Sequence, residues 1–160
     1  MQGIRLNLGI VFGVFFVFTG CTTLNDATLR ELDRTADKAL AKMVLAFPGL
    51  QSELGLSQGY LVLQRSGSWV PTVGKKGYGI LTGKSSGAHS YFRIEQVELN
   101  GAWGVGDYTG LMVLPQTVEL DQVIAEGLTL ENSGTLYIYA EDEHPAAYSI
   151  KIISMKPLER

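Results

Sequence analysis

The chain has 160 residues, of which 46% are hydrophobic and 18% are charged, and it includes 19 glycines. This length and composition predict one ordered domain, rich in turns or strands and large enough to bury a hydrophobic core. The formal net charge of −3 argues against a nucleic-acid-binding protein, because such proteins typically carry a strong excess of basic residues.

The N-terminal segment has the pattern of an export signal. Arg5 precedes the apolar run LNLGIVFGVFFVF at positions 6–18, and the small residues of TGC follow it. The run is shorter than the roughly 20 residues that a membrane-spanning helix needs. A positive start, an apolar middle and a small-residue exit are typical of a secretory signal peptide, so we expect export from the cytoplasm.

The only cysteine of the chain, Cys21, stands directly after this exit. Residues 18–21, Phe-Thr-Gly-Cys, resemble the lipobox of bacterial lipoproteins, with Phe18 where Leu is usual. The resemblance implies that residues 1–20 are removed as a lipoprotein signal peptide and that Cys21 is then acylated. An ordinary secreted protein with a spare thiol and an uncleaved N-terminal anchor are the alternatives.

The lipobox resemblance also implies a location. In Gram-negative bacteria, Asp after the lipidated cysteine tends to retain a lipoprotein in the inner membrane, and here the residue is Thr22. We therefore expect a lipid-anchored protein of the outer membrane that faces the periplasm. Two or three acyl chains make such an anchor effectively permanent, because each buried CH₂ contributes roughly 0.8 kcal/mol.

A long amphipathic helix is predicted after a short polar tether at residues 21–27. Thr28 and Glu31 have the spacing of a capping box, with Asn25 and Asp26 as alternative caps. A Pro-Gly pair ends the helix. Apolar residues recur at helical spacing and form one broad face: Leu29, Leu32, Ala36, Ala39, Leu40, Met43 and Phe47.

Four basic residues recur at intervals of four on the polar side of this helix: Arg30, Arg34, Lys38 and Lys42. Each step drifts by about 40° around the helix, so the four charges spread over the polar side. A basic amphipathic helix can lie on an anionic membrane surface. Acidic residues are interleaved with the basic ones, however, and a helix packed on its own domain with a solvated charged face is the alternative.

From Gly59 onward the pattern is that of β-strands, with short runs of branched and aromatic residues separated by glycines. Such spacing predicts antiparallel strands in a twisted sheet or partial barrel. Alternation over residues 89–96 places Phe92 and Ile94 inward. The segment PQTVELDQVIAEG predicts a short helix that ends at Gly127, and the last strands form a hairpin. The expected class is α+β, with the N-terminal amphipathic helix packed on the sheet.

The glycine-rich segment 77–92 contains GKSS at positions 83–86, which resembles the end of a nucleotide-binding P-loop. The first glycine that a P-loop requires falls on Tyr78, and strand-like alternation follows where a helix should begin. We therefore predict a hairpin without a bound nucleotide, in which glycines allow neighbouring strands to approach closely.

No motif of this sequence predicts catalysis. His89 and His144 have no G-x-S-x-G serine as a partner, and Cys21 is assigned to the anchor. The acidic cluster AEDEH at 140–144 is interpreted as a solvated turn, with calcium binding as the alternative. We therefore expect a non-catalytic protein without a cofactor or metal.

Residues 36–127 resemble the SYLF domain, also known as the actin-binding domain of yeast actin-patch proteins. The similarity runs from AFPGL through GYLVL and VGKKGYG to HSYFRIEQVELNGAWGVGDYTGLMVL and the predicted helix before Gly127. The chain departs from the family in its shorter C-terminal segment. The resemblance implies a single SYLF-like domain at residues 28–157, as in bacterial lipoproteins of similar size.

The SYLF resemblance implies binding of anionic lipid headgroups without catalysis, because eukaryotic relatives bind phosphoinositide membranes through basic patches and an amphipathic helix. The positions to which this role carries over are Arg30, Arg34, Lys38, Lys42, Lys75, Lys76 and Lys84. The alternative is a structural or protein-interaction lipoprotein that docks an envelope partner. Its docking surface would be the aromatic β surface around Trp69, Trp103 and Tyr108.

Overall fold

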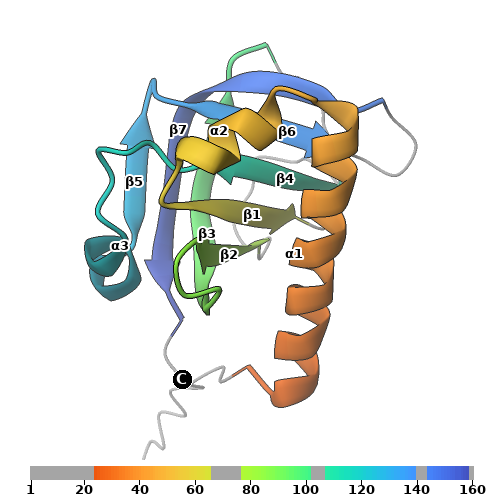
Figure 1. Ribbon diagram of the computed structural model, residues 1–160. Coiled ribbons are helices and arrows are strands. Elements are labelled where there is room, and N and C mark those ends of the chain that lie inside the picture. Colours follow the sequence, from red (N-terminus) through yellow and green to blue (C-terminus); the bar gives the residue numbers. More distant parts are fainter. Residues whose placement is uncertain (1–23, 66–76, 102–106, 140–143, 159–160) are drawn as a thin grey trace, which may run out of the picture.

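The computed structural model describes residues 24–65, 77–101, 107–139 and 144–158 (Figure 1). These residues contain three helices and seven strands, which confirms the expected α+β class. The helices are α1 (Asp26–Ala46), α2 (Leu50–Leu56) and α3 (Leu120–Glu126). The strands are β1 (Gly59–Arg65), β2 (Gly77–Gly83), β3 (His89–Leu99), β4 (Tyr108–Val113), β5 (Leu128–Glu131), β6 (Thr135–Tyr139) and β7 (Ala146–Pro157).

Six of the strands form a closed antiparallel barrel. The strand order is β3-β2-β1-β4-β6-β7, and β3 also pairs with β7, so the ring has no open edge. The expectation of a twisted sheet or partial barrel is corrected here by this closure. Closure is possible because β7 pairs with β6 through residues 146–149 and with β3 through residues 150–157. The short strand β5 lies outside the ring and pairs with residues 152–155 of β7.

The barrel strands have two apolar faces, because alternate side chains point to opposite sides of a strand. Leu61 and Leu63 of β1 pack in the barrel interior, where Phe92 and Met155 also lie. Val62, between the two leucines, points outward and packs under α1. Phe92 is buried as expected, and Ile94 is half-buried against the same interior cluster.

Helix α1 covers part of the outer face of the barrel and is capped by Asn25, whose side chain accepts a hydrogen bond of 2.8 Å from the backbone N–H of Thr28. The structure thus confirms Asn25, one of the alternative caps, in place of the capping box at Thr28, and the helix begins at Asp26. Its buried residues are Leu32, Ala36, Ala39 and Met43. The two alanines on this face let the helix approach the strands closely. The helix ends at Ala46 because Pro48 disfavours helical geometry at the residue before it, Phe47.

The remaining helices are short. Helix α3 ends at Gly127, as expected, and the positive φ of 97° explains the glycine there. Helix α2 is not predicted from the sequence, because seven residues are too few to show a periodic pattern. It buries Leu50 against the cluster under α1.

The segment with the GKSS motif is a hairpin of β2 and β3, as expected. The two strands pair antiparallel from Gly77 opposite Ile94 to Thr82 opposite His89, and a turn joins them. Close packing at these glycines is seen at Gly79, where a Cβ atom would lie 2.7 Å from the Met155 Sδ atom, and close strand approach also occurs at Gly59 of β1, opposite Gly83. A Cβ atom at Gly59 would lie 2.5 Å from the backbone oxygen of Thr82.

We expect Gly59→Ala to lower the free energy of unfolding by about 1–3 kcal/mol, because the new methyl group forces the β1 and β2 backbones apart. The matched control is Gly55→Ala in α2, where a Cβ atom would meet nothing within 4 Å. The control should be neutral or stabilising by up to about 1 kcal/mol. Chemical denaturation measures both, and equal effects of the two substitutions would contradict this account of Gly59.

Candidate functional site

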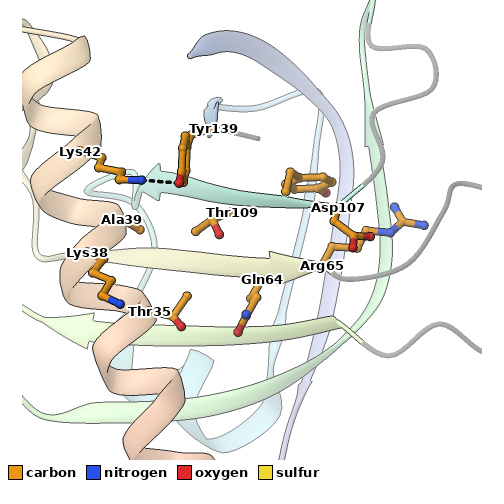
Figure 2. A pocket seen from close by; sticks show the side chains of 10 residues that line it. Thr35, Lys38, Ala39, Lys42, Gln64, Arg65, Asp107, Thr109 and Tyr139 are labelled. Atoms are coloured by element: carbon orange, nitrogen blue, oxygen red, sulfur yellow. Dashed lines mark hydrogen bonds between the residues drawn. The ribbon is translucent and has the colours of Figure 1, made fainter. Parts of the chain in front are cut away.

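A polar cleft lies between the middle of α1 and the outer face of the barrel (Figure 2). Its volume is about 320 Å³, which is at the lower end of the range for small-molecule sites. The described lining residues come from α1, β1, β4, β6 and the position before β4: Thr35, Lys38, Ala39, Lys42, Gln64, Arg65, Asp107, Tyr108, Thr109 and Tyr139.

Three strands contribute one row of side chains to the floor of the cleft. Gln64 of β1 lies opposite Thr109 of β4, and Thr109 lies opposite Tyr139 of β6. Residues paired across neighbouring strands point to the same face of the sheet, so these three side chains stand beside each other under the helix. The row thus presents an amide and two hydroxyl groups to the cleft.

The helix supplies the positive charge of the cleft. At about 100° per residue, Lys38 and Lys42 lie roughly 90–130° from the centre of the buried face of α1, whereas Arg30 and Arg34 lie roughly 150–170° from it. All four side chains are exposed. Because the four basic residues shift around the helix at each step, the two lysines lie at the edge of the barrel and the two arginines lie on the far side. Arg34 forms only an exposed ion pair with Glu31, at 4.0 Å.

The amino groups of both lysines point from α1 toward the strands (Figure 2). The Nζ atom of Lys42 donates a hydrogen bond to the hydroxyl of Tyr139 and lies 3.9 Å from the centroid of that ring. This contact holds Lys42 over the floor of the cleft. A cation above an aromatic ring is attracted by the negative face of the ring.

The negative charge among the described lining residues lies at one end of the cleft. Asp107 is the one carboxylate among the described lining residues, and it lies beside the stem of Arg65 (Figure 2). The Arg65 guanidinium points away from Lys38 and Lys42 (Figure 2). The part of the cleft next to α1 therefore combines two ammonium groups with neutral hydroxyl and amide groups.

This arrangement is suited to binding an anion. Lysine ammonium groups are donors only, and hydroxyl and amide groups can donate beside them. Hydrogen bonds from charged donors to phosphate or carboxylate oxygens are about twice as strong as neutral ones. In the part of the chain that the structure describes, no three His, Cys, Asp or Glu side chains are grouped so that they could hold a metal ion.

Of the other predicted headgroup-binding residues on the strands and turns, only Lys84 is described, and it does not line the cleft. Lys84, in the turn between β2 and β3, donates a hydrogen bond to the backbone oxygen of Gly55. Lys75 and Lys76 lie outside the described residues, as does Cys21. Most of the acidic cluster, residues 140–143, also lies outside them.

The predicted aromatic docking surface needs a correction at Tyr108. This side chain is only 5% exposed and belongs to the barrel core, because β4 turns it inward. It is therefore not available as a surface for a protein partner. Trp69 and Trp103 lie outside the described residues.

Sequence reasoning did not find Thr35, Gln64, Thr109 and Tyr139. These residues are neutral, and the last three lie on strands that are distant in the sequence. Strand alternation could have placed the three strand residues on the outer face, since each follows an inward residue: Leu63, Tyr108 and Ile138. The register that brings them into one row is a tertiary property.

Two buried tyrosines differ in how their hydroxyl groups are satisfied. The Tyr137 hydroxyl donates to Glu53 Oε1 at 2.9 Å, and burial together with this carboxylate raises the pKa of Tyr137 to about 12. The Tyr108 hydroxyl is buried, and the Arg65 guanidinium approaches it without reaching good hydrogen-bond geometry. Burial raises the pKa of Tyr108, and the positive charge and the N–H donors of the nearby Arg65 guanidinium oppose this effect.

We expect Tyr108→Phe to raise the free energy of unfolding by up to about 1 kcal/mol, because it removes a buried hydroxyl that makes no hydrogen bond of good geometry. The matched control is Tyr137→Phe, which deletes a donor to a carboxylate and should cost about 1 kcal/mol. Denaturation curves of both variants test this contrast. Destabilisation by both substitutions would show that the Tyr108 hydroxyl is satisfied in solution.

Comparisons of the chain with protein-family models, with curated proteins and with solved structures find no match. Over the described parts of the chain, no helix is long and apolar enough to cross a membrane. The function is therefore argued from the sequence motifs and from the chemistry of the cleft.

Proposed function

We propose that the protein is a lipid-anchored bacterial envelope protein whose SYLF-like domain binds anionic lipid headgroups without catalysis. The anchor is the acylated Cys21, and the location is the periplasmic side of the outer membrane. The observation that carries the proposal is the cleft beside α1, where Lys38 and Lys42 face a row of neutral hydrogen-bonding groups.

The charge of the whole chain does not favour an anionic surface, so the attraction must be local. Removal of residues 1–20 takes away Arg5 and leaves 12 basic and 16 acidic residues, a net charge of −4. Each lysine near an anionic membrane contributes about 1 kcal/mol, and the effect decays within a Debye length of about 8 Å at physiological salt. A headgroup bound in the cleft would lie within this distance of both lysines.

The anchor strengthens this weak interaction. A protein that is already held at the bilayer meets headgroups at a high effective concentration, so a low intrinsic affinity suffices. The protein-docking alternative is less well supported, since Tyr108, one of its three aromatic residues, is buried in the barrel.

We expect the processed chain with Cys21→Ser to sediment with anionic vesicles, and less so at high salt, but not with neutral vesicles. Replacing Lys38 and Lys42 together by Gln should weaken binding about 25-fold, which corresponds to about 2 kcal/mol for two lysines. Vesicle sedimentation at several lipid concentrations measures the change in apparent Kd.

The matched control for this experiment is the double substitution Lys151→Gln and Lys156→Gln. It changes the net charge equally, but these lysines are paired with Glu98 at 2.9 Å and with Glu95 at 3.0 Å, away from the cleft. The control should weaken binding less than about threefold. Equal losses for both double variants would argue for diffuse attraction and against the cleft.

The proposed anchor is tested separately in cells of a Gram-negative host. The full chain should incorporate labelled palmitate and fractionate with the outer membrane, and Cys21→Ser should abolish the label, because the thiol is the acylated atom. A wild-type chain that carries no label would refute the lipoprotein assignment, whatever the vesicle experiments show.

A further inference from the structure

A second cavity, which we call the apolar groove, lies at the other end of α1. Its volume is about 640 Å³, twice that of the polar cleft. Its walls come from the start of α1, from β3, from α3 and from the end of β7. Figure 1 shows the start of α1 and the end of β7 at the same end of the barrel.

The lining of the groove is predominantly aliphatic or aromatic. Leu24 and Leu29 come from the N-terminal side, and Ile124 comes from α3. Ile124 is 46% exposed, one of few large apolar side chains in the described chain that remain open to solvent. Phe92, which is fully buried, contributes to the wall from the barrel. Such a surface gains free energy when an apolar group replaces water on it.

The charge at the groove restricts what can occupy it. Asp26 is the only charged residue among the described lining residues. A carboxylate repels the ionised head of a free fatty acid at short range. An acyl chain in a neutral ester or amide linkage carries no such charge and is therefore the better complement.

The described chain begins at the groove, since Leu24 is both its first residue and part of the lining. Cys21 precedes Leu24 by three residues, and three residues span at most about 11 Å. A group attached to the Cys21 sulfur therefore starts within reach of the groove.

We propose that the apolar groove binds one acyl chain carried by Cys21 of the same molecule. The presence of an acyl chain on Cys21 rests on the proposed lipoprotein anchor, whereas the ability of the groove to bind an alkyl chain does not. Binding covers the exposed face of Ile124 and keeps the chain out of water whenever the protein is away from a bilayer. The groove thus gives the acyl chain of the anchor a binding site on the protein in addition to the bilayer.

The test uses the processed chain that begins at Cys21. All described helices and strands lie between Asp26 and Pro157, so removal of residues 1–20 leaves them whole. Because Cys21 is the only cysteine, a maleimide modifies it alone. An N-hexadecyl maleimide installs a long alkyl chain, and N-methyl maleimide gives the matched short one. Both products are studied without detergent.

We expect the hexadecyl product to remain monomeric in size-exclusion chromatography and to melt roughly 3–6 °C above the methyl product, because a bound chain stabilises the folded state. Ile124→Glu, placed in the groove, should abolish the shift in Tm and cause the hexadecyl product to self-associate. The control Leu45→Glu changes an 83% exposed leucine outside the lining and should preserve both properties.

Self-association of the wild-type hexadecyl product, an unchanged Tm, or equal behaviour of the two glutamate variants would overturn the groove proposal. These outcomes do not depend on whether cells acylate Cys21, since the alkyl chain is installed chemically. Failure of the palmitate-labelling experiment would instead remove the natural source of the chain. The two failures are therefore distinguishable.

Discussion

The pairing of β7 with β3 is the constraint on which the rest of the structure depends. It joins the two ends of the strand order and converts a sheet with two open edges into a barrel. Without it, β3 and β7 would each expose a row of unpaired backbone groups. β7 is the longest strand, with 12 residues, and its length allows it to pair with β6 first and with β3 afterwards.

Barrel closure also decides which side chains can function. The interior is filled with apolar residues, so a ligand site has to lie on the outside or at an end. On the outside, α1 covers the strands through Ala36 and Ala39, and the polar row of Gln64, Thr109 and Tyr139 lies along one flank of the helix. The polar cleft therefore follows from packing a helix with one apolar face on a barrel that is wider than the helix.

The two cavities beside α1 have complementary chemistry. The cleft at Lys38 and Lys42 is cationic and hydrogen-bonding, and it is suited to an anionic headgroup. The groove at Leu24 and Leu29 is apolar, and it is suited to an aliphatic chain. A lipid consists of these two parts. The proposed functions of the cleft and the groove would place both kinds of contact along one helix.

Local patterns in the sequence determined several of the elements, although not α2. Alternation identified the strand with Phe92 inward, glycine spacing excluded a P-loop in favour of the β2–β3 hairpin, and Gly127 marked the end of α3. Residue periodicity encodes these features because they involve neighbours along the chain. Only the tertiary structure decided that the barrel closes and that Tyr108 is buried. It also decided that, of the four basic residues on α1, Lys38 and Lys42 are the two that line the polar cleft. These properties depend on the register between segments far apart in the sequence.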